Sequence, residues 1–110
     1  MTLWTGTRKG GAVACGEARV PFRAGPGTPE RIVVGIRPED VEVTETPGDG
    51  AWPASVEVEE PLGAATLLTL RVGDEKLRAL ARPREWPERV WVRWPTEKTH
   101  AFDAATGRRL

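Results

Sequence analysis

The sequence has almost no cysteine or histidine, and this scarcity excludes several classes of site. It contains one cysteine, Cys15, so an internal disulfide and a cysteine-based metal cage are both excluded. It contains one histidine, His100, so a zinc site would need carboxylate ligands from scattered positions. We therefore expect no metal centre.

Net charge and long apolar runs are also absent. The chain has 16 basic and 16 acidic side chains and a formal net charge of zero, whereas nucleic-acid-binding proteins usually carry a basic excess. No apolar run approaches the roughly 18 residues that a membrane span needs. The N-terminal residues have no signal-peptide pattern. The simplest interpretation is a soluble protein of a reducing compartment, without a nucleic-acid partner.

The usual catalytic motifs are missing. "GAVACGE" has two glycines at the spacing of a phosphate-binding loop, but Glu17 stands where that loop needs lysine. A Ser-His-Asp triad would have to use Ser55 and His100, and Ser55 lies within an alternating strand pattern. Glu59 and Glu60 could suggest acid–base work, but adjacent strand residues point to opposite faces. We expect no catalytic residue, no cofactor and no enzymatic activity.

Short runs of alternating apolar residues, separated by Gly and Pro, make up most of the 110 residues. This pattern predicts an all-β fold, an OB-like barrel of short antiparallel strands with one or two helical turns. The length suits one domain. We expect residues 1–30 to form an N-terminal strand and hairpin region and residues 31–110 to form the main barrel.

Alternation and turn residues together give the positions of several strands. The pattern predicts a first strand at 3–7, a hairpin over 10–22 that turns at Gly16-Glu17, and a strand at 31–36 buried on both faces. Within 54–60, Val56 and Val58 are expected to face inward. The clearest hairpin turns at Gly73-Asp74, and a last strand is expected at 100–103. Three further strands should each present one apolar face. These faces comprise Leu68, Leu70 and Val72 before the Gly73 turn, Leu77, Ala79 and Ala81 after it, and Val90, Val92 and Trp94 nearer the C-terminal end.

A proline-stiffened corner, Arg37-Pro38-Glu39-Asp40, follows the strand at 31–36. Pro38 holds φ near about −65°, which suits a first helical position. Glu39 and Asp40 then lie at the N-terminus of the turn, where negative charge is favoured. The sequence predicts a short helical turn here. Arg37 could pair with a carboxylate of the same domain or across an interface.

The segments "MTLW", "VGIRPEDVEV", "VEVEEPLGAATLLTLRVGDEKLRALA" and "THAFDAATGRRL" follow one another along the chain. Together they resemble the transport-associated OB (TOBE) domain, the C-terminal regulatory domain of ATP-binding subunits in maltose-type ABC importers. "VGIRPEDVEV" is similar to the family's Gly-Ile-Arg-Pro-Glu motif, and "VEVEEPLGAATLLTLRVGDEKLRALA" to its Val-Glu-x-Leu-Gly-x-Glu-Thr block. "THAFDAATGRRL" resembles the closing His-x-Phe-Asp-x-x-Thr-Gly segment, and "MTLW" resembles the opening of the domain. The resemblance covers essentially the whole chain.

The chain also departs from the family pattern. Thr2 replaces the usual Asn, Ala65 stands where Glu is common, and Asp40 follows Arg-Pro-Glu where His is frequent. The Walker lysine, the Ser-Gly-Gly-Gln signature and the switch histidine of the ATPase domain do not occur. The chain is either an excised piece of a longer subunit or a product that kept only the regulatory part.

The resemblance implies a non-catalytic regulatory and dimerisation domain of a carbohydrate or glycerol-phosphate importer. Its implied partners are the ABC ATPase domain, a second copy of the subunit and, indirectly, the membrane subunits. Its implied location is cytoplasmic, at the inner face of the membrane. The candidate interface or regulatory residues are Arg37, Glu39, Trp91, Leu67 and His100. Trp91 and Leu67 would form a hydrophobic contact patch if exposed.

One other function stays open on the sequence, and another is disfavoured by the zero net charge and by the family resemblance. A small-ligand OB domain acting alone would bind a sugar or an oxyanion, and "GTRKGG" at 6–11 is the candidate segment for an anion. A single-strand nucleic-acid binder would need a basic groove with exposed aromatics. Its candidate residues are Trp91, Arg93, Arg78 and Arg82.

Overall fold

Two antiparallel sheets of five strands each form the fold in the computed structural model, which describes residues 1–23 and 25–110. The strand order is β10-β4-β1-β2-β3 in one sheet and β5-β9-β6-β7-β8 in the other. The strands are β1 Thr2–Lys9, β2 Ala12–Cys15, β3 Ala18–Pro21, β4 Arg31–Ile36, β5 Glu42–Thr44, β6 Trp52–Pro61, β7 Thr66–Val72, β8 Glu75–Ala81, β9 Arg89–Arg93 and β10 His100–Asp103. The predicted all-β, OB-like class is confirmed.

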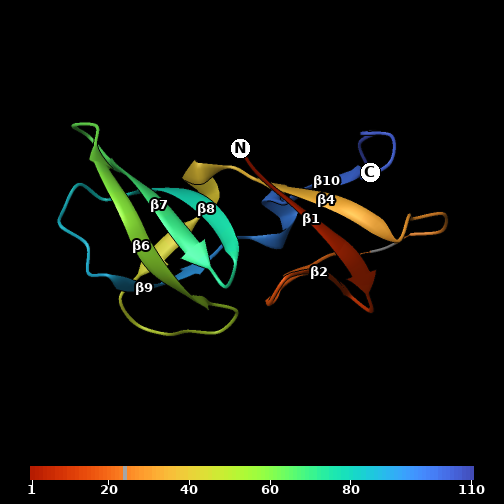
Figure 1. Cartoon of the computed structure of the whole chain (residues 1–110), viewed down its shortest axis with the longest axis horizontal. Coiled ribbons are helices and arrows are strands. Elements are labelled where there is room, and N and C mark those ends of the chain that lie inside the picture. The colour runs from red at the N-terminus through yellow and green to blue at the C-terminus, as the bar shows by residue number, and fades with distance from the viewer. Residues whose placement is uncertain (24) are drawn as a thin grey trace.

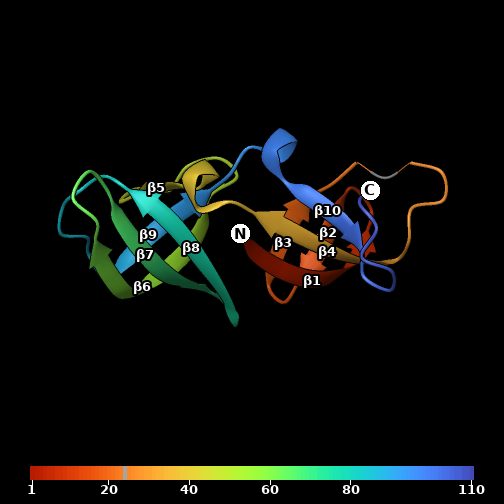
Figure 2. The ribbon, with the colours of Figure 1, turned by 90° about the horizontal axis from the view of Figure 1, so that it is seen from above.

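The two curled sheets lie side by side along the long axis of a molecule measuring 45 × 24 × 22 Å (Figures 1 and 2). We call the sheet that contains β1 the first lobe and the sheet that contains β6 the second lobe. β4 and β10 complete the first lobe around β1, so the lobes do not divide the chain at residue 30. That the chain acts as a single domain stays a prediction.

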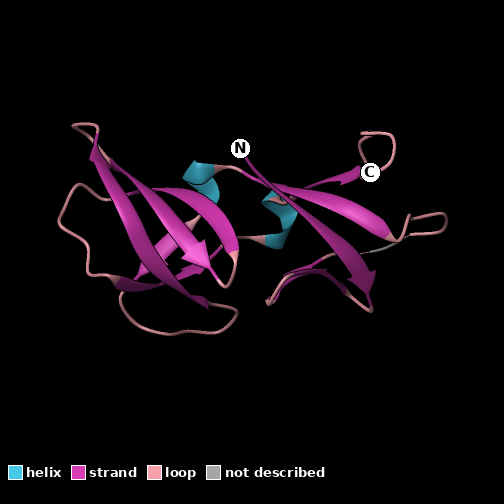
Figure 3. Ribbon diagram, viewed as in Figure 1, coloured by secondary structure: helices cyan, strands magenta, loops and turns pink. Residues whose placement is uncertain are grey.

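The chain crosses between the lobes at two short 3-10 turns, η1 Pro38–Asp40 and η2 Thr96–Lys98 (Figure 3). η1 links β4 of the first lobe to β5 of the second, and η2 links β9 back to β10. Pro38 occupies the first turn, as predicted, and Lys98 Nζ lies 3.5 Å from Asp40 Oδ1. The stiff corner therefore sets the angle at which the chain leaves one sheet for the other. No helix in the described part of the chain has the length and hydropathy to cross a membrane.

Alternation along the strands builds the core. The predicted inward positions of the second lobe are buried, namely Leu68, Leu70, Val72, Leu77, Ala79, Val90 and Val92, while Ala81 and Trp94 are half-buried. The first lobe buries Val13, Val20, Ile32, Val34 and Ile36 in the same way. Each such side chain contributes about 1.5–3 kcal/mol through removal of apolar surface from water.

The hairpin turns lie where the sequence predicted them. Gly16 and Gly73 have φ of 60° and 59°, in the left-handed region that glycine tolerates best. Each connects strands that pair directly, β2 with β3 and β7 with β8. Local turn chemistry therefore determined these two pairings.

Two expectations about burial are wrong. Val58 was expected to face inward, but its side chain is 52% exposed, because a register shift between Val56 and Val58 reverses the alternation of β6. The strand at 31–36 is central, between β10 and β1, but it is not buried on both faces. Val33 is half-buried and lies on the outer face of the first lobe.

Candidate functional site

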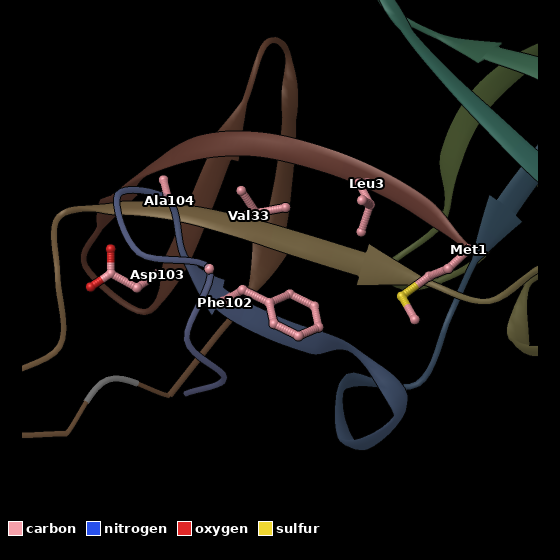
Figure 4. A pocket seen from close by; sticks show the side chains of 7 residues that line it. Met1, Leu3, Val33, Phe102, Asp103 and Ala104 are labelled. Atoms are coloured by element: carbon pink, nitrogen blue, oxygen red, sulfur yellow. The ribbon is translucent and has the colours of Figure 1, made fainter.

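An apolar hollow of about 460 Å³ lies on the outer face of the first lobe (Figure 4). We call it the outer hollow. Strands β1, β4 and β10 and the turn that follows β10 form it. Its lining residues are Met1, Leu3, Val33, Phe102, Asp103, Ala104 and Gly107. Met1 and Leu3 are 55% and 61% exposed, so this apolar surface is open to solvent.

The alternation of three neighbouring strands produces this surface. Residues that point into the core, such as Trp4 and Val34, leave Leu3 and Val33 on the outer side. Phe102 stands directly opposite Val33 in the pairing of β10 with β4. The run "IVVGI" thus supplies the core with one set of side chains and the outer hollow with the other.

Gly35 lets the side chain of Met1 lie directly on β4. A Cβ at this position would collide with the Met1 sulfur and would approach Leu3 Cδ2 to 3.3 Å. Gly35 stands opposite Leu3 on one side and His100 on the other. A side chain at this position would make the Met1 side chain move, so Gly35 allows Met1 to lie in this position over β4.

His100 lies at the edge of the first lobe, next to the outer hollow. Its Nδ1 is 2.7 Å from a guanidinium nitrogen of Arg109. Because the arginine guanidinium can only donate, Nδ1 is the acceptor in this hydrogen bond. Backbone hydrogen bonds hold the C-terminal segment along β10, from Asp103 N to Arg108 O at 2.8 Å and from Leu110 N to Ala101 O at 2.9 Å. His100 therefore helps to hold this segment over the strand edge.

Arg37 and Glu39 are both located at the corner between the lobes, and both are exposed. Within residues 1–23 and 25–110, neither side chain takes part in an ion pair. The intramolecular alternative for Arg37, pairing with a carboxylate of its own domain, therefore has no support in this structure. A contact of Arg37 with a partner stays a prediction.

Trp91 and Leu67 do not form a common patch. Trp91 is half-buried, pairs with Thr44 and Pro53, and lies against the loop that precedes β6. Leu67 is also half-buried and stands opposite Glu60, seven residues along β6 from Pro53. That interval spans roughly 23 Å at about 3.3 Å per strand residue. The two residues lie near opposite ends of the second lobe.

The residues considered for nucleic-acid binding and for a catalytic triad do not lie together in the structure. Trp91 and Arg93 lie on β9, whereas Arg78 and the β8 edge before Arg82 lie on the far side of β6 and β7. Arg93 donates to Glu42 at 2.8 Å, and this ion pair raises the pKa of its guanidinium. Ser55 lies in the second lobe and His100 in the first, so they do not form a triad. In the described residues, no cluster of His, Cys, Asp and Glu could hold a metal ion.

The outer hollow was not predicted from the sequence. Its signal was present in two short runs, "MTLW" and "IVVGI", each of which carries apolar residues on both faces of one strand. The second run was interpreted as a fully buried strand, because an apolar run does not by itself distinguish a covered face from an open one.

The sequence profile described as "TOBE domain" matches residues 34–102, which include β5 to β9 and parts of β4 and β10. The chain belongs to the TOBE domain family. The resemblance inferred from the four segments is thereby confirmed. The matched region contains Arg37, Glu39, Leu67, Trp91 and His100, and it includes Phe102 of the outer hollow but not Leu3.

The TOBE domain chain is also similar to parts of longer ATP-binding proteins. It is 34% identical over 83 residues to the sn-glycerol-3-phosphate import ATP-binding protein UgpC of Salmonella typhi, with 73% of this chain and 23% of that protein covered. It is 38% identical over 82 residues to the sulfoquinovosyl glycerol transport ATP-binding protein SmoE of Agrobacterium fabrum, with coverage of 72% and 23%. It is 36% identical over 84 residues to the multiple sugar-binding transport ATP-binding protein MsmK of Streptococcus mutans, with coverage of 70% and 22%. This chain thus spans about a quarter of the length of these relatives.

Proposed function

We propose that this TOBE domain is a non-catalytic regulatory and dimerisation domain of an ABC importer ATP-binding subunit. Relatives whose names describe import of glycerol phosphate, sulfoquinovosyl glycerol and sugars support an importer of this substrate class. The domain acts in the cytoplasm at the inner face of the membrane, together with the ATPase domain and, through it, the membrane subunits. The outer hollow is the observation that carries the proposal, because an open apolar surface favours protein contact over chemistry.

The occupant of the outer hollow in this proposal is a second copy of the chain. A twofold contact places the same apolar surface against itself, so both sides lose water from Leu3 and Phe102. Charge at the two ends of β10 favours this arrangement. Asp103 lies at one end, and the His100–Arg109 pair lies at the other. A twofold axis that passes through the hollow perpendicular to β10 brings the acidic end of one copy near the basic end of its partner, and zero net charge adds no repulsion.

Sedimentation velocity over a rising concentration range tests the dimer. The wild-type chain should shift from monomer to dimer, and Leu3→Asp should weaken dimerisation by about tenfold or more. The physical reason is that a buried leucine contributes about 1.5–3 kcal/mol, which the aspartate loses in each copy.

Leu62→Asp is the matched control, because Leu62 is 54% exposed but lies at the β6–β7 turn of the second lobe. It should dimerise like the wild type. A wild-type chain that stays monomeric at every concentration would contradict the proposal for this domain. Equal weakening by both substitutions would place the contact away from the outer hollow.

A further inference from the structure

A second pocket, of about 360 Å³, lies where the two lobes meet. We call it the junction pocket. It is lined by Met1, Thr2 and Leu3 at the start of β1, by Pro38 of η1, and by Thr69, Lys76 and Arg78 of the β7–β8 hairpin. Figure 2 shows the N-terminal end of β1 between the lobes, close to β8. Unlike the outer hollow, this pocket combines an apolar wall with a wall of polar and cationic side chains.

The strand register brings the polar side chains together. Thr69 stands directly opposite Arg78 in the pairing of β7 with β8. Lys76 lies two residues before Arg78, so both side chains project from the same face of β8. One hydroxyl, one ammonium and one guanidinium therefore face the same pocket from adjacent strands.

The positive charge of this wall is not neutralised within the described residues. No carboxylate lines the junction pocket, and neither Lys76 nor Arg78 belongs to an ion pair there. The neighbouring cation on the same face, Arg71, differs because its Nε donates to Glu57 Oε2 at 3.0 Å. The carboxyl group of Glu75 lies beside Gly16 in the first lobe, on the other side of the hairpin.

Two hydrogen bonds between the lobes hold the wall in place. Trp4 Nε1 donates to the carbonyl oxygen of Lys76 at 2.7 Å, and the backbone N–H of Arg78 donates to Thr2 Oγ1 at 3.2 Å. Both bonds join β1 to the free edge of β8. Because Thr2 Oγ1 accepts this bond, its own hydroxyl proton can be donated to a ligand.

We propose that the junction pocket binds a phosphate group. A phosphate dianion accepts many hydrogen bonds, and Arg78, Lys76 and the hydroxyls of Thr2 and Thr69 offer donors from two sides. Charge-assisted hydrogen bonds of this kind are the strong ones, and the arginine fork matches phosphate geometry. The phosphate can be free or carried on a small molecule, since Leu3 and Pro38 supply an apolar wall for a short carbon skeleton.

Titration of the ¹⁵N-labelled chain at low ionic strength tests this site. Inorganic phosphate and glycerol 3-phosphate are the two ligands, and glycerol is the uncharged comparison. Saturable shifts of the Thr2, Thr69, Lys76 and Arg78 amide signals are expected with at least one of the two phosphates and not with glycerol. If both ligands shift these signals, the phosphate group alone is sufficient for binding. If only glycerol 3-phosphate does so, the carbon skeleton is also needed.

The double variant Lys76→Gln/Arg78→Gln should raise the dissociation constant by about tenfold or more, because charge-assisted bonds are lost. Thr69→Val, of similar shape, should weaken binding several-fold. The matched control is Lys9→Gln/Arg108→Gln, which removes the same charge from two exposed positions outside the pocket. It should bind like the wild type. Absence of saturable shifts with both phosphates, or equal loss of affinity in the two double variants, would overturn the proposal.

Discussion

At the scale of single residues, Cys15 has the most clearly altered chemistry. Its side chain is 0% exposed, between β1 and the second lobe, and burial raises the pKa of its thiol from 9.0 to about 11, with a further contribution from the charge of Glu75. The thiolate is the reactive form of cysteine. The folded protein therefore keeps Cys15 protonated and inert at neutral pH.

This pKa predicts how stability changes with pH. In the unfolded chain the thiol ionises first, so between pH 9.0 and about 11 the unfolded state binds fewer protons than the folded state. The contribution of the Cys15 thiol to the free energy of unfolding is complete below pH 9.0 and is lost as pH rises through about 11. The free energy of unfolding should therefore fall by about 2–3 kcal/mol over this interval from this group.

Urea unfolding at a series of pH values, compared between the wild type and Cys15→Ala, measures this effect. The alanine variant should be less stable at neutral pH but should lack the alkaline decline that comes from the thiol. A thiol reagent should leave the native wild type unmodified at neutral pH and should react once urea is added. Identical pH profiles for the two proteins would contradict the assigned cause.

At the scale of elements, β1 connects the parts of the first lobe. It pairs with β2 on one side and with β4 on the other, and the residues that follow Trp4 approach β2 closely. A Cβ on Gly6 would lie 2.7 Å from both Cys15 Sγ and Val13 Cγ1 and would also collide with the Ala14 carbonyl oxygen. The curl of β1 therefore depends on the missing side chain at position 6.

Gly6→Ala should destabilise the fold by about 2 kcal/mol or more, because overpacking a close-packed core forces backbone movement. Urea unfolding followed by circular dichroism measures the loss. Gly11→Ala is the matched control, since a Cβ at Gly11 meets nothing within 4 Å, and its effect should be small. A Gly6→Ala variant as stable as Gly11→Ala would show that β1 can move away from β2 without cost.

At the scale of the whole molecule, Trp4 joins the two lobes. It is 2% exposed, donates a hydrogen bond to Lys76 O across the junction, and meets Trp94 edge to face with ring centroids 5.6 Å apart. Trp94 follows β9, in the segment that returns the chain to the first lobe. The Trp4 side chain thus contacts both β8 of the second lobe and the segment that leads from β9 back to the first lobe.

Trp4→Phe tests this joint because it keeps an aromatic ring but removes the indole N–H. The free energy of unfolding should fall by about 1–3 kcal/mol, since the Lys76 carbonyl loses its partner and the smaller ring leaves space. Trp52→Phe is the control, because Trp52 is only half-buried against the core of the second lobe. Trp52→Phe should lower the free energy of unfolding by less than Trp4→Phe does. Equal losses in the two variants would argue against a special role for Trp4 at the junction.

Much of the fold followed from local sequence. The turns at Gly16 and Gly73 need positive φ, and the runs beside them alternate, so both hairpins were predictable from neighbouring residues. Pro38 predicted the turn at the corner in the same way. By contrast, the bulge after Val56 left no pattern in the sequence, and it reversed the predicted facing of Val58. Bulges depend on the partner strand, which local alternation does not identify.

The candidate site was less predictable than the fold. His100 was named as a candidate and lies at the rim of the outer hollow, but Leu3 and Phe102 were not named. Trp91 and Leu67 were named together, and the register of the second lobe separates them. Exposure depends on what covers each face of a strand, and residues far along the chain provide that cover.

The sequence by itself determined the strands, their tight turns, the stiff corner at Pro38 and the family to which the chain belongs. Only the tertiary structure decided that β4 and β10 join β1, that an apolar face stays open beside them, and that Lys76 and Arg78 meet the start of β1. The physical reason is that a period of two residues assigns each side chain to a face of its own strand. It contains no information about which distant strand packs beside that face, because packing of the whole chain determines the neighbour.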